Sequence, residues 1–101
     1  MIRSFACGAT EALFHSHALV RFRKIERVAR RKLLQLHATS EVATLRVPPG
    51  NQLEALKGGR KGQYSIGVND RWHICFRWDA EGAHDVEIVD YHLECFTWPR
   101  S

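Results

Sequence analysis

Two runs in the second half of the chain alternate apolar residues with polar or small ones, as strands with one buried face do. The apolar positions are Tyr64, Ile66 and Val68 in the first run and Trp72, Ile74, Phe76 and Trp78 in the second. Facing residues of an antiparallel pair share a face, so a three-residue loop, Asn69 to Arg71, is predicted between them. We expect the apolar face to form the core. The opposite face, which carries Gln63, Ser65, Gly67, His73, Cys75 and Arg77, is expected to be polar and open.

A further strand is predicted over residues 85–92, which are rich in Val, Ile and Tyr. Val86 and Ile88 point to one face, and Asp90 and His92 continue on that face where the strand ends. The tip of this strand therefore delivers a carboxylate, a phenol and an imidazole together. The simpler interpretation is a strand that turns polar as it leaves the core.

Two registers are allowed between this strand and the preceding one. In both, the connection between the strands lies within residues 79–84. Pairing Trp78 with Val86 and Phe76 with Ile88 keeps the apolar face continuous. That register sets Arg77 opposite Glu87 and His73 opposite Tyr91. A shift of two residues is also allowed and sets His73 opposite Val89.

The first half of the chain is predicted to be mostly helical. A helix is expected over 21–37, because Phe22, Ile25, Val28, Ala29, Leu33 and Leu36 recur at helical spacing. A short helix is expected over 10–14 with Thr10 as its N-cap, and residues 2–5 are expected to form a short strand. Residues 48–51, with two prolines and a glycine, read as a turn or ordered loop.

Positive charge is concentrated in the first part of the chain. Residues 1–62 hold twelve Lys and Arg against four acids, whereas the remainder holds three against seven. Six of these cations fall mostly outside the apolar stripe of the long helix: Arg23, Lys24, Arg27, Arg30, Arg31 and Lys32. Such a face is either solvated or binds phosphates or an acidic partner, and the pattern does not choose between these.

Size and cysteine content limit the class of protein. At 101 residues the chain is long enough for one modest core. No apolar run approaches the roughly 18 residues that span a bilayer, so no membrane association is expected. Three cysteines without metal-binding spacing favour a reducing compartment, hence the cytoplasm. His15 and His17 lack further nearby ligands, and no metal site is predicted.

The polar residues near the predicted sheet rim match the needs of metal-free RNA cleavage. A base removes the 2′-OH proton, cations stabilise the phosphorane, and an acid protonates the leaving oxygen. The candidates are Asp90, Tyr91 and His92 from the last strand, His73 and Arg77 from the middle strand, Lys57, Arg60 and Lys61 from a glycine-spaced loop, and Glu54. Composition alone does not separate cleavage from RNA binding.

Several motifs in order resemble the HigB toxins of the RelE/ParE superfamily. They are Pro48-Pro49-Gly50-Asn51, Leu53-Glu54-Ala55-Leu56-Lys57-Gly58, Gly62-Gln63-Tyr64-Ser65-Ile66, Val68-Asn69-Asp70, Ile74-Cys75-Phe76-Arg77-Trp78 and Val86-Glu87-Ile88-Val89-Asp90-Tyr91-His92. The resemblance covers residues 1–92, which we expect to form a single toxin domain, and leaves 93–101 as a C-terminal tail. It implies an α+β fold of the RelE type, with two N-terminal helices packed on a small, mostly antiparallel twisted sheet.

The resemblance also implies an activity. HigB toxins cleave mRNA in translating ribosomes without a metal or other cofactor. A HigA antitoxin, a helix-turn-helix protein, holds them inactive, and operator DNA is bound through that antitoxin. The active-site pattern carries over to Lys57, Asp90, Tyr91 and His92, with Glu54 and His73 at positions that vary in the family. Ribosome docking would use Arg23, Lys24, Arg27, Arg30, Arg31, Arg60 and Lys61.

Two departures from the family pattern suggest weakened activity. His73 stands where relatives usually have Arg, and Gly67 stands where they often have Arg. Both remove positive charge from the expected open face. Two other readings stay open: a ParE-like poison that binds a protein such as gyrase, and a degenerate copy that retains only antitoxin binding.

Overall fold

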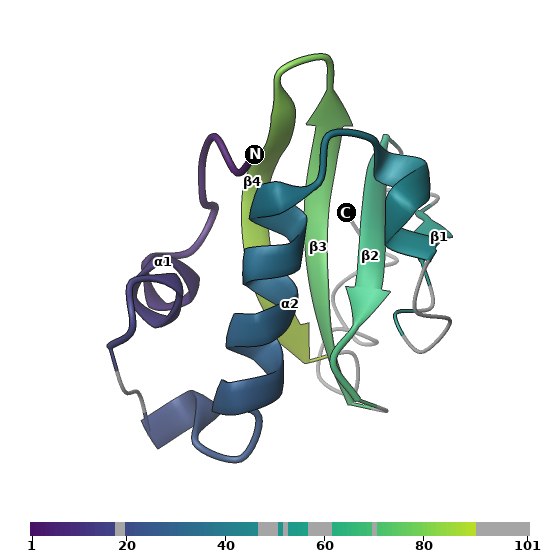
Figure 1. Cartoon of the computed structure of the whole chain (residues 1–101). Coiled ribbons are helices and arrows are strands. Elements are labelled where there is room, and N and C mark those ends of the chain that lie inside the picture. Colours follow the sequence, from purple (N-terminus) through teal and green to yellow (C-terminus); the bar gives the residue numbers. More distant parts are fainter. Residues whose placement is uncertain (18–19, 47–50, 52, 57–61, 70, 91–101) are drawn as a thin grey trace.

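The architecture is a four-stranded antiparallel sheet with helices on one side (Figure 1). The computed structural model describes residues 1–17, 20–46, 51, 53–56, 62–69 and 71–90. In chain order the elements are α1 (Gly8–Phe14), the 3₁₀ turn η1 (Val20–Phe22), α2 (Glu26–Ala38), the 3₁₀ turn η2 (Val42–Arg46), β1 (Glu54–Ala55), β2 (Gln63–Gly67), β3 (Trp72–Asp79) and β4 (Gly82–Asp90). The strand order is β1-β2-β3-β4, and α2 lies across one face. The predicted α+β class, with two helices on a small antiparallel sheet, is confirmed.

The β2–β3 hairpin has the predicted register. Tyr64 pairs with Phe76, and Ile66 pairs with Ile74. The loop begins where the backbone N–H groups of Val68 and Asn69 donate to the carbonyl of Trp72 at 2.9 and 3.2 Å. The Asn69 side chain then accepts the N–H groups of residues 71 and 72, both at 2.8 Å. An Asx turn of this kind explains why an odd loop is stable here.

The β3–β4 pairing follows the shifted register. Ile74 pairs with Ile88 and His73 with Val89, so the register that set Trp78 against Val86 and His73 against Tyr91 is wrong. Two features cause the shift. The turn is tighter than expected, since Asp79 already pairs with Gly82. An irregularity between Cys75 and Arg77 then lets two residues of β4 face one of β3.

This bulge centres on Asp85, whose φ of 53° lies in the left-handed region. Arg77 therefore faces His84, and Glu87 faces Cys75, which corrects the expected Arg77–Glu87 pair. The extra residue reverses the order in which β4 side chains alternate between the two faces of the sheet. Ala83 and Val86 would point to opposite faces in a regular strand, yet here both are buried in the core. The apolar face stays continuous because the backbone bends locally.

The core lies between α2 and the sheet. Its α2 side is formed by Ile25, Ala29, Leu33 and Leu36, all of them buried. The sheet side is formed by Ile66, Ile74, Phe76, Val86 and Ile88, also buried. The predicted stripe is thus largely confirmed, although Val28 lies at its edge and is only partly buried.

The long helix begins later than predicted. Residues 20–25 form tight turns in which Arg23 N–H bonds to Val20 O at 3.2 Å and Ile25 N–H bonds to Phe22 O at 3.0 Å. α2 starts at Glu26 rather than at residue 21. The turns bring the Phe22 ring edge-on to Trp72, with ring centroids 5.7 Å apart. This aromatic contact joins the start of α2 to the start of β3.

One cation of the predicted basic face is buried instead of solvated. Lys32 is 8% exposed and donates from Nζ to Asn51 Oδ1 at 2.7 Å. The Asn51 amide nitrogen donates in turn to Leu45 O at 3.1 Å and to Gln35 Oε1 at 3.2 Å. Burial, and secondarily the charge of Arg31, lowers the pKa of Lys32. The network ties Asn51 to α2. It also gives the buried ammonium group of Lys32 the hydrogen-bond partner that a buried charge requires.

The N-terminus packs on β4 through two parallel bridges, Ile2 with Ala83 and Phe5 with Val86, rather than through a full strand. Thr10 is not the N-cap of α1, because the helix starts at Gly8 with Cys7 in the cap position. The buried Thr10 hydroxyl instead accepts the Ile88 N–H at 3.0 Å. This bond fixes α1 against β4.

Gly82 provides a direct test of the N-terminal packing. Its φ is +127°, and a Cβ there would overlap the carbonyl oxygen of Met1. We expect Gly82→Ala to lower the free energy of unfolding by about 2 kcal/mol or more, since strained backbone and steric overlap act together. Urea denaturation measures this. Gly8→Ala is the matched control, because nothing lies within 4 Å of its Cβ position; equal losses for the two variants would contradict the packing.

Candidate active site

Strand β4 ends at Asp90 with its carboxylate turned toward the helix side of the sheet. Asp90 faces Trp72 across the ladder and is 4% exposed. Its Oδ2 accepts a charge-assisted bond from Nε of Arg71 at 2.6 Å. A buried carboxylate needs a nearby counter-charge, and this guanidinium supplies one. Tyr91 and His92 follow directly in the sequence but lie outside the described residues.

Arg71 pairs with a buried carboxylate but is itself largely exposed. Its side chain is 58% exposed, whereas that of Asp90 is 3% exposed. The guanidinium lies 6.0 Å from the centre of the Trp72 ring, within cation–π distance. It borders an open hollow of about 380 Å³, whose described lining residues are Val20, Arg23, Lys24, Ile25, Arg71 and Trp72. Three cations and an indole therefore meet beside the end of β4.

The other candidates described by the structure lie on the opposite face. His73 pairs with Gly67 and Val89, so it points away from the helices. Glu54 is exposed on β1 and faces Ser65. Because β2 lies between their strands, Glu54 and His73 are separated by about 10 Å or more. The structure thus brings Asp90 together with Arg71 but with neither His73 nor Glu54.

The expectation that this face is open is wrong at its centre. Ser65 is 1% exposed and Cys75 is 0% exposed. Both are short side chains in the middle of the sheet, where Ser65 lies between Glu54 and Cys75, and Cys75 lies between Ser65 and Glu87. Small groups in such positions lose contact with water even on a polar face.

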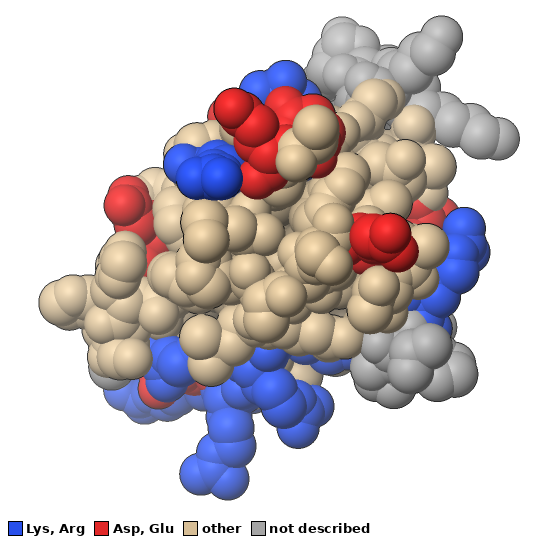
Figure 2. Space-filling model, turned by 45° about the horizontal axis from the view of Figure 1, so that its top comes forward, with Lys and Arg blue, Asp and Glu red and all other residues tan. Residues whose placement is uncertain are grey.

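The cations of the predicted docking face divide into two groups. Arg23, Lys24, Arg27 and Arg31 are exposed. Arg30 is only partly exposed, and it donates from Nε to Leu13 O at 3.0 Å and from Nη1 to Glu26 at 3.3 Å. Arg30 thus ties α1 to α2, and with Lys32 it corrects the idea of a uniformly solvated face. Figure 2 shows Lys and Arg side chains gathered along one edge of the molecule, with few acids among them.

Arg77 lies away from the end of β4. It is exposed, and its Nε donates to Asp85 Oδ2 at 2.7 Å. The remaining predicted cations, Lys57, Arg60 and Lys61, lie outside the described residues. Their predicted contacts therefore remain predictions.

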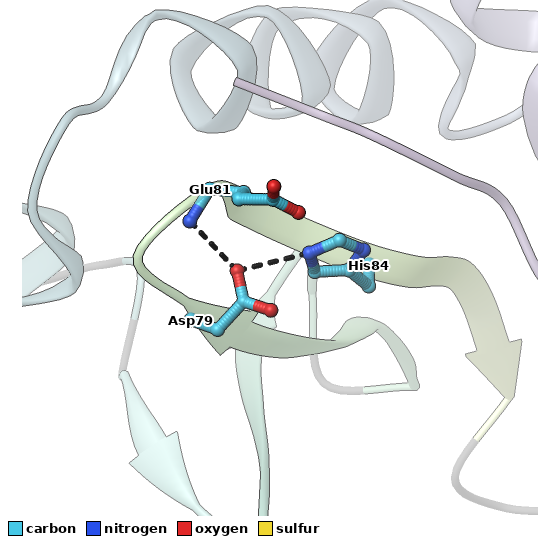
Figure 3. A group of neighbouring side chains, drawn as sticks. All are labelled: Asp79, Glu81 and His84. Atoms are coloured by element: carbon cyan, nitrogen blue, oxygen red, sulfur yellow. Dashed lines mark hydrogen bonds and ion pairs between the residues drawn. The ribbon is translucent and has the colours of Figure 1, made fainter.

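A separate cluster of polar side chains, Asp79, Glu81 and His84, lies at the β3–β4 turn (Figure 3). Asp79 Oδ1 accepts the Glu81 N–H at 2.8 Å and Nε2 of His84 at 3.0 Å. The ligand atoms of these three side chains lie within 4.8 Å of one another. The bonds close the turn, and the Glu81 N–H, aided by His84, lowers the pKa of Asp79. Asp79, Glu81 and His84 thus have a structural part in closing the turn.

Comparison with known proteins decides the family. The family described as RelE-like toxin of type II toxin-antitoxin system HigB matches residues 13–92. Toxin HigB-1 of Vibrio cholerae serotype O1 is 44% identical over 68 residues, which are 67% of this chain and 70% of that protein. The chain belongs to the HigB-like toxins. The predicted resemblance is confirmed, and a toxin of a type II toxin–antitoxin system has an antitoxin as its partner.

The HigB-like match ends at residue 92 and excludes the tail. The division into a 1–92 domain and a 93–101 tail remains a prediction. Within the described residues, no helix of this HigB-like toxin is long and apolar enough to cross a membrane.

Sequence reasoning missed Arg71, which it assigned only to a loop. The signal was present in the alternative register, because setting His73 opposite Val89 also sets Trp72 opposite Asp90. Residue 71 then lies beside a carboxylate at a strand end. What the sequence lacked was a reason to prefer that register, which the Asp85 bulge supplies.

The turn cluster makes a pH-dependent prediction. The pKa of Asp79 is lowered from its usual 3.8, so its contribution to stability is complete above that value and is lost as the pH falls through the lower folded value. We expect wild type to exceed Asp79→Asn in unfolding free energy at pH 6, and the difference to shrink as the pH falls below 3.8. Urea titrations at several pH values measure it. A difference that stays constant as the pH is lowered until wild type itself unfolds would contradict the assignment.

Proposed function

We propose that this HigB-like toxin is a ribosome-dependent, metal-independent endoribonuclease that cleaves mRNA by acid–base catalysis. One observation carries the proposal furthest. The strand that leads directly into Tyr91-His92 ends at an ion pair, Asp90 with Arg71, beside a cationic hollow. A rigid strand end next to clustered positive charge suits chemistry on a phosphodiester.

The proposed reaction needs a proton carrier and a charge acceptor. The 2′-OH of the RNA attacks the adjacent phosphorus, its proton passes to a base, and the leaving 5′ oxygen receives a proton. His92 serves in proton transfer, since imidazole titrates near neutrality. Lys57 stabilises the charge of the phosphorane, and Tyr91 positions or stacks on a base.

Among the possible helpers of Lys57, the geometry favours His73 over Arg77. His73 pairs with Val89, next to the end of β4. Arg77 pairs with His84 close to the opposite end and is bonded to Asp85. For Asp90, burial and the bond to Arg71 favour an orienting role over proton transfer. Glu54, which lies on the same face of the sheet as His73, would act as a base.

The proposed partners follow from the same activity. A HigA-like helix-turn-helix antitoxin would hold the toxin inactive and carry the pair to operator DNA. The ribosome would present the mRNA, and exposed Arg23, Lys24, Arg27 and Arg31 would dock against its RNA. The site of action would be the cytoplasm.

His92→Gln tests the mechanism. The variant keeps a similar size and polarity but cannot transfer a proton, so we expect it to abolish mRNA cleavage while the thermal midpoint stays the same. Primer extension on transcripts after induction measures cleavage. His17→Gln, at an exposed position, is the control. Cleavage by His92→Gln would remove this residue from the mechanism, and intact messages with wild-type toxin would favour the ParE-like alternative.

His73→Arg tests whether the toxin is attenuated. A permanently charged guanidinium near the end of β4 would strengthen phosphate binding, so we expect cleavage to rise about tenfold, equivalent to about 1.4 kcal/mol. Growth arrest and primer extension measure the gain. His17→Arg adds the same charge elsewhere. No gain from His73→Arg would count against attenuation at this position, and no growth arrest with either protein would favour a copy that only binds antitoxin.

A further inference from the structure

The hollow beside Arg71 has the composition of an anion site. Its described lining includes Arg23, Lys24 and Arg71 and no acidic residue. Arg23 and Lys24 are exposed, and they reach this position because the tight turns before α2 carry them toward the start of β3. Three cations from two distant segments therefore converge on one concavity, where their repulsion favours a bound anion.

Arg71 is pre-organised for such a ligand. Its Nε donates to Asp90 Oδ2 at 2.6 Å, and its Cζ lies over the Trp72 ring, 6.0 Å from the centroid. Within the described part of the chain, nothing accepts a hydrogen bond from its two terminal nitrogens. A guanidinium carries five N–H donors in a fixed fork, so holding Nε leaves four donors aimed in a defined direction. Less side-chain entropy is lost when a phosphate binds to a guanidinium already held in place.

We propose that Arg71, Arg23 and Lys24 bind a backbone phosphodiester of RNA, and that Asp90 is a positioning residue that orients Arg71. The proposal rests on the endoribonuclease function and adds a contact on the helix side of the sheet, away from His73 and Glu54. RNA is favoured over an acidic peptide because the exposed Arg27 and Arg31 continue the positive surface along α2, as a polyanion requires. The phosphodiester belongs either to the mRNA or to ribosomal RNA.

Equilibrium binding tests the site without any cleavage. The probes are a labelled 2′-O-methyl RNA oligonucleotide, which has no nucleophilic hydroxyl, and vacant ribosomes. The variants are Arg71→Gln and the double variant Arg23→Gln/Lys24→Gln. The control is Arg46→Gln, an exposed cation outside the hollow. We expect each test variant to weaken binding about tenfold at 0.1 M salt, and to flatten the slope of log K against log salt by about 0.7 for each lost phosphate contact.

The two probes separate the sources of the phosphate. Weaker binding of the oligonucleotide supports a messenger contact, and weaker binding of ribosomes alone supports a ribosomal RNA contact. Wild-type affinity of both variants for both probes would overturn the site. The site would also be overturned if the variants lost the antitoxin complex while their RNA binding stayed unchanged. That result would indicate that the hollow binds an acidic protein segment instead. Arg23→Gln/Lys24→Gln leaves the Asp90 pair intact, so it decides the matter if Arg71→Gln does not fold.

A double-mutant cycle tests the positioning role of Asp90. Asp90→Asn should weaken oligonucleotide binding several-fold in the wild-type background and have no further effect when Arg71 is already Gln. Equal effects in both backgrounds would show that Asp90 does not act through Arg71. These readings are independent of the catalytic assignment: persistent cleavage by His92→Gln would refute the mechanism while leaving the binding results unchanged.

Discussion

The β3–β4 ladder, with its single bulge, is the constraint on which the rest of the structure depends. Because two residues of β4 face one of β3, the alternation changes phase at Asp85. Ala83 before the bulge and Val86 after it both reach the core. The same phase change carries Asp90 to the helix side, where its carboxylate is buried against Trp72. A one-residue feature in the middle of a strand thus determines the electrostatics at its end.

A buried carboxylate in turn limits what can surround it. Asp90 would be costly without a counter-ion, and Arg71 from the neighbouring loop supplies one. That pair fixes the guanidinium over Trp72, and Trp72 is held edge-on by Phe22 from the turn before α2. The cationic hollow therefore lies beside the proposed catalytic end of β4 for three connected reasons. The register buries Asp90, the ion pair holds Arg71, and the aromatic contact holds Trp72 against the turn before α2.

Much of the fold was predictable from alternation alone, as the β2–β3 hairpin shows. Its loop parity followed from keeping Tyr64, Ile66 and Val68 on the face of Ile74 and Phe76, and the register is as expected. The β3–β4 register was left with two solutions, since an aspartate in a strand does not by itself identify a left-handed residue at position 85. Charge counting also failed locally: Arg30 and Lys32 look like surface residues but bind Leu13 and Asn51. Position on a helix does not reveal which long side chains fold back into the protein.

The Phe22–Trp72 contact means that the arrangement of positive charge is controlled from within the core. Neither ring carries a formal charge, yet together they set how far the η1–α2 turn stands from the start of β3. If the hollow binds RNA as proposed, the strength of that contact depends on these two uncharged rings as well as on the cations themselves.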